Sequence, residues 1–251
     1  LAVFAAMLTG NPHAFDNGTA AGNFLYQIIQ MDLEIREIKI ESSEIFLAYK
    51  RQKSYLMAGI MLDDISNYAM LYQVQAVKKD GNLHKGMEGF ASEQHIVQVP
   101  LAVIAEWESL HCPQDEIYIV ENPSVFAVLC GKEKTRNARR AYMCMNGQPR
   151  LASFLLLDFL RETHQFLYAG DFDPEGLLIA QRLKERYEDS LYLWKYEAEW
   201  YKKYLYGVRL SGSRIKKLDH VYRPELLEIK KWMQKEQKAA YQEAMIEIYL
   251  D

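Results

Sequence analysis

The segment that organises the sequence is Gly170-Asp171-Phe172-Asp173-Pro174-Glu175-Gly176. It follows the apolar run Gln165–Ala169 and precedes a helical pattern over residues 177–187, so we expect it to connect a strand to a helix. Carboxylates two positions apart at a strand end point to the same side of the pleat, so Asp171 and Asp173 can share one divalent cation. Mg²⁺ suits such a site because it prefers oxygen ligands and often needs only one or two carboxylates. An ordinary acidic turn, in which an Asp caps the helix, is the alternative interpretation.

A second strand pattern also ends in an acidic residue. The apolar run Glu116–Val120 is followed directly by Glu121 and then by another helical stretch. The carboxyl ends of neighbouring parallel strands lie at one edge of a sheet, so Glu121 is expected to face Asp171 and Asp173. Glu121 is then a candidate general acid or base, or a further metal ligand. Glu175 is either an extra ligand or a charge that favours the helix N-terminus.

Strand and helix patterns alternate from residue 113 onward. The predicted strands are residues 116–120, 141–145, 165–169 and 191–195, and the predicted helices are residues 124–130, 149–163 and 174–187. This alternation favours an α/β fold with a mostly parallel sheet that is covered by helices. We therefore predict a catalytic domain over residues 113–251, with a helical C-terminal extension over residues 224–250.

The preceding residues, 1–112, are predicted to form a mixed, mainly helical accessory region. Thr19 is expected to cap a helix that runs to Met31, and residues 42–59 have apolar positions at helical spacing. The predictions for the rest of this region are strands at residues 69–77 and 94–99, a loop at residues 78–89 and a helix at residues 101–110.

Composition sets limits on the class of protein. The chain has 251 residues, of which 49% are hydrophobic, and a net charge of -4. No apolar run reaches the ~18 residues that a membrane span needs, so we expect a cytoplasmic protein without membrane association. The three cysteines are widely spaced, which suggests neither a disulfide framework nor a zinc site.

Basic residues gather at places where they could contact phosphates. Arg136, Arg139 and Arg140 lie in one connection, and Lys216 and Lys217 lie in another. A further arginine, Arg150, lies between a predicted strand and its helix, where backbone N–H groups could also bind a phosphate. These six residues are the candidate DNA contacts, and solvated charge runs or a plain turn are the alternatives.

Several motifs together resemble a known group of proteins. A single Glu after one strand and Asp-x-Asp-Pro-x-Gly after a later one resembles the Toprim domain, in the form found in topoisomerase VI A-like proteins. The sequence is more similar still to the nuclease component (JetD) of Wadjet plasmid-defence systems. The segments that carry this similarity are Thr9-Gly10-Asn11-Pro12-His13-Ala14-Phe15-Asp16, Val120-Glu121-Asn122-Pro123-Ser124-Val125, Asn146-Gly147-Gln148-Pro149-Arg150, residues 170–176 and Tyr241-Gln242-Glu243-Ala244.

The resemblance implies a Toprim-like fold and cleavage of DNA phosphodiesters with Mg²⁺, or with Mn²⁺ as an alternative ion. It implies Glu121, Asp171 and Asp173 as the catalytic residues. It further implies circular plasmid DNA as the substrate and an SMC-type ATPase complex as the partner, with a further domain before Leu1. We also expect a homodimer. No Gly-x-x-x-x-Gly-Lys-Ser/Thr loop occurs in the chain, so ATP binding would have to come from the partner.

Other mechanisms and functions remain open at this point. Topoisomerases of this group cleave with a tyrosine, but none of the 17 tyrosines matches that role, so hydrolysis by a metal-activated water is preferred. A non-catalytic interaction protein with the same fold is a second hypothesis. A small-molecule phosphotransferase or phosphatase is a third, but Phe172-Asp173-Pro174 does not supply its expected motif.

Overall fold

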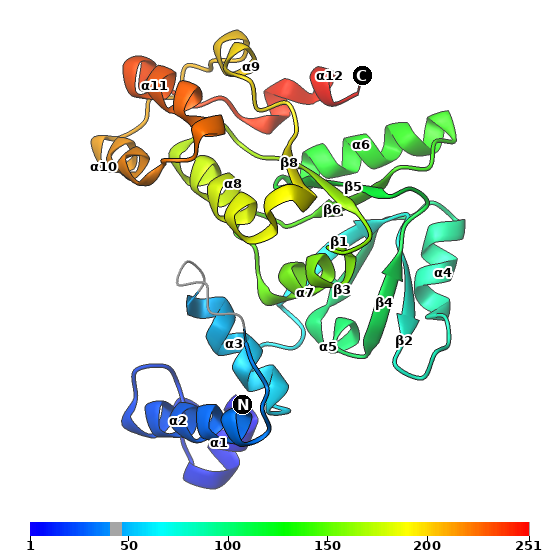
Figure 1. Cartoon of the computed structure of the whole chain (residues 1–251), viewed down its shortest axis with the longest axis vertical. Helices are drawn as coiled ribbons and strands as arrows, with labels where there is room; N and C mark the ends of the chain where they lie inside the picture. Colours follow the sequence, from blue (N-terminus) through cyan, green and yellow to red (C-terminus); the bar gives the residue numbers. More distant parts are fainter. Residues whose placement is uncertain (41–46, 251) are drawn as a thin grey trace. The chain divides into compact units, whose positions relative to one another are not determined.

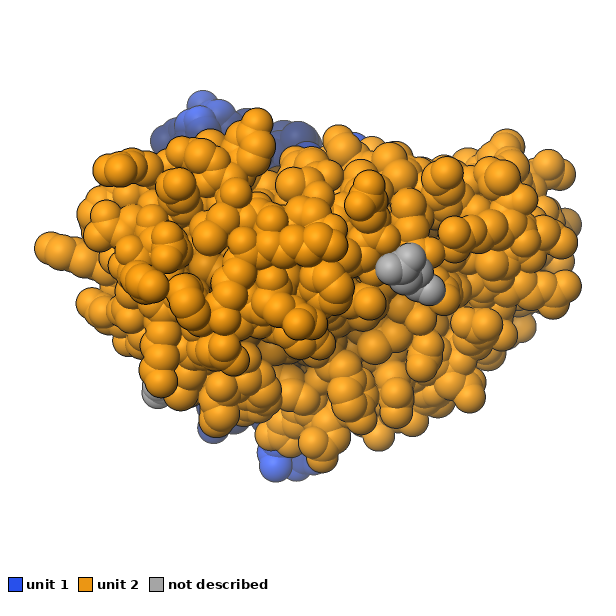
Figure 2. Space-filling model, turned by 90° about the horizontal axis from the view of Figure 1, so that it is seen from above, with its two compact units in different colours: residues 1–67, 100–102 blue, residues 68–99, 103–251 orange. Residues whose placement is uncertain are grey.

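The structure is a computed structural model that describes residues 1–40 and 47–250. The chain divides into two compact units, coloured separately in Figure 2. Unit 1 contains residues 1–67 and 100–102, and unit 2 contains residues 68–99 and 103–251. Within the described residues, no helix has the length and apolar character that crossing a bilayer requires.

Unit 1 is helical. Its helices are α1 (Ala2–Thr9), α2 (Ala20–Ile35) and α3 (Leu47–Met57). Thr19 caps α2 as predicted, because its hydroxyl accepts the Gly22 N–H at 2.9 Å. Ile29 and Leu33 of α2 are buried together with Tyr55 of α3. The helical pattern predicted from residue 42 lies outside the described residues over positions 42–46.

Unit 2 is built on a six-stranded mixed sheet with the order β3-β1-β6-β5-β7-β8 (Figure 1). Its strands are β1 (Tyr68–Tyr72), β3 (Val97–Pro100), β5 (Glu116–Val120), β6 (Ala141–Cys144), β7 (Gln165–Ala169) and β8 (Leu191–Leu193). Strands β5 to β8 are parallel, whereas β1 runs antiparallel to β6. The predicted α/β class with a mostly parallel sheet is confirmed. The compact unit begins at residue 68, so β1 and β3 belong to the sheet and not to a separate accessory region.

Helices cover both faces of this sheet (Figure 1). Helix α6 (Pro123–Arg136) lies on one face, and α7 (Leu151–Leu160) and α8 (Pro174–Tyr187) lie on the other, as right-handed crossovers in this strand order require. Helix α7 is apolar on nearly all sides and is almost wholly buried. Arg186 of α8 joins it through an ion pair with Asp158, at 2.9 Å.

Three predictions for residues 69–110 were wrong. The single strand at residues 69–77 is two strands, β1 and β2 (Gln75–Lys78), because Gln73 turns the backbone with a φ of 59°. The loop at residues 78–89 contains the start of α4 (Lys85–Ser92), which His84 caps by accepting the Met87 N–H. The helix at residues 101–110 is a single turn, α5 (Leu101–Ile104), followed by strand β4 (Trp107–His111).

The error at β4 has an identifiable cause. Strand β4 pairs with β2, and the register shifts so that Val77 faces Ser109 while Lys78 faces Trp107. This bulge lets Trp107 and Leu110 both point inward although they are three positions apart. A three-residue apolar spacing therefore imitates a helix in the sequence.

The C-terminal third contains several short helices. They are η2 (Glu188–Ser190), α9 (Ala198–Lys203), α10 (Gly212–Lys216), η3 (Lys217–His220), η4 (Pro224–Leu226), α11 (Leu227–Glu236), η5 (Gln242–Met245) and α12 (Ile246–Tyr249). The predicted helical tail is interrupted at Gln237, whose φ is 51°. Residues 238–242, here called the C-terminal strap, are extended up to Tyr241 and end at the first residue of η5; they form bridges from Ala240 to Phe172 and from Lys238 to Arg209.

Candidate functional site

Neighbouring strands bring Glu121 and Asp171 to the same edge of the sheet. Val120 is the register partner of Ala169, and the chain continues beyond this pair to Glu121 on one side and to Gly170 and Asp171 on the other. A Cβ on Gly170 would lie 2.6 Å from the Tyr168 hydroxyl, and nearer still to Oε1 of Glu121. Only glycine lets the Glu121 carboxylate pack this closely against the end of β7.

The Glu121 carboxyl group is buried, with 7% of the residue exposed. Its Oε1 accepts a hydrogen bond from the Tyr168 hydroxyl. Burial raises the pKa of Glu121 to about 8, with the Tyr168 hydrogen bond opposing the shift and the charges of Asp171 and Asp173 adding to it. Close by, the buried Tyr196 hydroxyl makes no hydrogen bond to any described residue.

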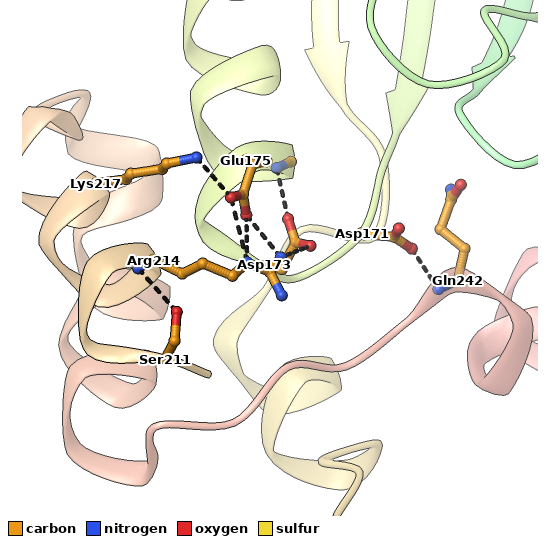
Figure 3. Close-up of polar contacts among 8 residues, drawn as sticks. Asp171, Asp173, Glu175, Ser211, Arg214, Lys217 and Gln242 are labelled. Atoms are coloured by element: carbon orange, nitrogen blue, oxygen red, sulfur yellow. Dashed lines mark hydrogen bonds and ion pairs between the residues drawn. The ribbon is translucent and has the colours of Figure 1, made fainter. Parts of the chain in front are cut away.

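The C-terminal strap holds Asp171 and Glu121 in place. The backbone N–H of Gln242 donates to Oδ1 of Asp171 at 2.8 Å (Figure 3). The side-chain oxygen of Gln242 accepts the N–H groups of Glu121 and Asn122, each at 3.2 Å. Burial raises the pKa of Asp171 to about 6, and the Gln242 hydrogen bond only partly offsets this shift.

Asp173 uses both of its carboxylate oxygens, one in a hydrogen bond and one in an ion pair. As the N-cap of α8 it accepts the Gly176 N–H through Oδ1 at 2.7 Å. Its Oδ2 pairs with Nη2 of Arg214 at 2.5 Å. Burial raises the pKa of Asp173, although the Gly176 N–H and Arg214 act in the opposite direction.

Glu175 lies in an ion-pair cluster with two basic residues (Figure 3). Arg214 donates to it through Nε at 3.0 Å and through Nη2 at 2.6 Å, and Nζ of Lys217 lies 2.9 Å from its Oε1. Partial burial opposes ionisation of Glu175, but the hydrogen bonds from Arg214 and Lys217 outweigh it and lower the pKa to about 2.

The donor set fits a divalent cation in part. Among the residues that the structure describes, no three His, Cys, Asp or Glu side chains are grouped closely enough to hold a metal ion. Glu121 and Asp171 each retain one oxygen to which no described residue donates, and neither forms an ion pair with a described residue. Two carboxylates can suffice for Mg²⁺, which usually keeps several waters, so this pair fits the ion. Glu175 does not fit it, because Arg214 and Lys217 occupy its carboxylate.

The candidate DNA contacts fall at two opposite edges of the sheet. Arg150 is exposed at the start of α7, beyond the carboxyl end of β6, and its guanidinium lies over the Tyr68 ring. Lys216 ends α10 and Lys217 begins η3; both are exposed, and Lys217 pairs with Glu175. Arg136, Arg139 and Arg140 precede β6 and therefore lie at the amino edge, away from Glu121. They are already engaged in part, since Arg136 donates to the Leu250 carbonyl and Arg140 pairs with Glu133.

The structure adds residues that the sequence patterns do not assign to the site. Arg214 belongs to a basic run near Lys216, and Gln242 belongs to the segment Tyr241–Ala244 near the C-terminus. No sequence signal places either residue against the acids. The alternation of side chains along β7 places Tyr168 on a buried face of the strand. Its hydrogen bond to Glu121, however, depends on the neighbouring strand.

Comparisons with known families cover most of the chain. Residues 97–251 match a family described as "Protein of unknown function C-terminus (DUF2399)". Residues 1–76 match a family described as "Protein of unknown function N-terminus (DUF3323)". No protein with a curated description matches the sequence.

Proposed function

The chain belongs to the DUF2399 family, and we propose that it is a metal-dependent DNA endonuclease with a Toprim-like fold. The observation that carries the proposal is that the buried Glu121 carboxylate and the half-buried Asp171 carboxylate follow the ends of neighbouring parallel strands, with no ion-pair partner among the described residues. Carboxylates in such a position are costly unless a cation or a proton compensates them. A hydrolytic site that binds Mg²⁺, or alternatively Mn²⁺, explains why the two carboxylates lie in this position.

The residues have distinct proposed roles. Asp171 and Glu121 would hold the ion through their open oxygens, and Oδ2 of Asp173 would join them if Arg214 moved away. Bound Mg²⁺ would supply Lewis-acid stabilisation of the charge that develops on the phosphoryl group. In the absence of metal, burial raises the pKa of Glu121 to about 8, so this carboxyl group can exchange a proton near neutral pH, and Tyr168 fixes its orientation.

DNA would approach the carboxyl edge of the sheet. Arg150, Lys216 and Lys217 lie at this edge and are proposed to contact backbone phosphates. Arg136, Arg139 and Arg140 lie at the other edge. In this proposal they would contact either DNA that wraps around the protein to that side or a partner protein. The motif resemblance supports two further parts of the proposal, circular plasmid as substrate and an SMC-type ATPase complex as partner. A homodimer and a cytoplasmic location complete the proposal as separate expectations.

A non-catalytic interaction protein is the second candidate, and one observation favours it. Arg214 and Lys217 neutralise two of the acidic residues at the edge, Asp173 and Glu175, without any metal. If this arrangement were permanent, the edge would be a structural ion-pair cluster. Metal binding separates the two candidates, because only the nuclease requires it.

The test is plasmid cleavage by the complex reconstituted with ATP and Mg²⁺. Glu121→Gln is expected to reduce cleavage by roughly 10²–10⁴-fold, the range typical for loss of an acid–base group. Asp171→Asn is expected to lose metal binding and cleavage together, because Asp171 is a proposed ligand of the ion. Glu116→Gln is the matched control, because Glu116 lies at the opposite end of the same strand as Glu121. DNA association should persist in all three variants, since phosphate contacts by basic residues supply it. A folded Glu121→Gln protein that cleaves at the wild-type rate would refute the proposed site.

A further inference from the structure

Arg214 lies between two acidic residues of the same turn (Figure 3). Its Nη2 is 2.5 Å from Oδ2 of Asp173 and 2.6 Å from Oε2 of Glu175, so a single nitrogen bridges both carboxylates. Its Nε donates to Glu175 as well. The guanidinium is therefore held more firmly by Glu175 than by Asp173.

Asp173 has one oxygen that can be exchanged. Oδ1 accepts the Gly176 N–H and caps α8, so its loss would expose a helix terminus. Oδ2 has Arg214 as its partner. A divalent cation shared by Asp171 and Asp173 would need this same oxygen, and the guanidinium and the metal ion would repel each other there.

Glu175 is placed to retain Arg214 after that exchange. Two guanidinium nitrogens reach its carboxylate, and Lys217 supplies a further charge on the other oxygen. Arg214 also lies on a short element, because α10 has five residues and Ser211 caps it by accepting the Arg214 N–H. Moving the guanidinium off Asp173 thus breaks one contact and leaves its anchorage intact.

We propose that Arg214 is an exchangeable counter-ion that occupies the place of the divalent cation at Asp173, and that Glu175 holds this arginine instead of ligating the metal. The inference rests on the proposed function, since it presumes that Asp171 and Asp173 bind a cation. It assigns opposite effects to two residues of one cluster: Arg214 competes with the metal, whereas Glu175 affects the metal only through Arg214.

The test is calorimetric titration of the whole chain with Mg²⁺, and separately with Mn²⁺, in the absence of DNA and ATP. Arg214→Met keeps the apolar stem and removes the charge, so it is expected to tighten metal binding by about threefold to fivefold, the upper part of the range for a partly exposed ion pair. Lys217→Met is the matched control, because Lys217 contacts Glu175 and not Asp173. It should change the affinity by less than about twofold.

Glu175→Gln is measured in two backgrounds to separate the two possible roles of this residue. If Glu175 only holds Arg214, the substitution changes metal affinity in the wild type and has less than about a twofold effect in the Arg214→Met background. A loss of about tenfold or more in both backgrounds would identify Glu175 as a direct ligand and overturn the inference.

The outcomes also separate this inference from the proposed function. Binding by the wild type with unchanged affinity in Arg214→Met refutes the counter-ion role and leaves the metal site standing. Binding by Arg214→Met alone supports the inference in its strongest form. Absence of binding in both proteins refutes the metal site, and the inference fails with it.

Discussion

Gly170→Ala provides a test of the site geometry that requires no knowledge of substrate. The added Cβ would lie 2.6 Å from the Tyr168 hydroxyl and 2.8 Å from the Tyr196 hydroxyl, and closer to Oε1 of Glu121. Real Cβ atoms do not approach neighbours so closely, so these buried groups must shift. Overpacking of this kind costs about 1–3 kcal/mol. Loss of the bond between Tyr168 and Glu121 adds roughly 1 kcal/mol.

The expected destabilisation is therefore about 2–4 kcal/mol, measured by urea unfolding with circular dichroism. For a chain of this size it corresponds to a fall in Tm of roughly 4–16 °C. Gly131→Ala is the matched control, because Gly131 lies inside α6 and an added Cβ would meet nothing within 4 Å. The control should gain about 0.5–1 kcal/mol, as expected for Gly to Ala in a helix. Equal stability of Gly170→Ala and wild type would show that Glu121 does not pack against the end of β7.

Three further outcomes are expected. Asp158→Ala should lower the free energy of unfolding, measured in urea, by about 3–5 kcal/mol, because it leaves the Arg186 side chain, 3% exposed, without its carboxylate partner. The double variant Asp158→Leu with Arg186→Met should recover most of this loss. Asn122→Ala should cost about 1 kcal/mol, because Asn122 caps α6 by accepting the Ser124 and Val125 N–H groups; Asn122→Ser should retain most of the stability. Mg²⁺ at ten times its Kd should stabilise the wild type by about 1.4 kcal/mol and leave Asp171→Asn unchanged, and an equal shift in both proteins would contradict the role of Asp171.

Sequence patterns predicted the strands and helices that position the acids. Strands β5 and β7 were predicted with their observed bounds, because each is a short apolar run bounded by turn residues. Helix α8 begins at Pro174, directly after the Asp173 cap, as the local sequence indicates. These features depend on neighbours a few positions away, which is why a single sequence reveals them.

The region before residue 113 was harder to predict because tertiary pairing decides its structure. Trp107 and Leu110 have a spacing that fits a helix, yet the bulge against β2 makes them part of a strand. Gln73 ends β1 with a positive φ although nothing in its chemistry requires a turn there. The membership of β1 in the main sheet likewise depends on its pairing with β6, about 70 residues later in the chain.

The partners of the acidic residues illustrate the same limit at the site itself. Arg214 is 41 residues from Asp173, and Gln242 is 121 residues from Glu121. Local patterns placed the carboxylates at the strand ends but left Glu175 as either an extra ligand or a charge at the helix N-terminus, because nothing local shows that Arg214 folds back onto it. The C-terminal strap contributes to this contact, since it pairs with Phe172 on one side and with Arg209 on the other.

Charge at the carboxyl edge has to be considered for the whole set of residues. Glu121, Asp171, Asp173 and Glu175 are the carboxylates of the candidate site, and the two cations that pair with them among the described residues, Arg214 and Lys217, engage only Asp173 and Glu175. Within this set, four negative charges against two positive ones leave a deficit of two positive charges at Glu121 and Asp171, and the charge of Glu243 also acts on Asp171. Burial raises the pKa of both, to about 8 and about 6, so a proton on Glu121 removes part of this deficit when no metal is bound. A single divalent cation would balance it completely while displacing that proton. Metal binding at this edge should therefore release protons, and calorimetric titration in buffers of different ionisation enthalpy would measure their number.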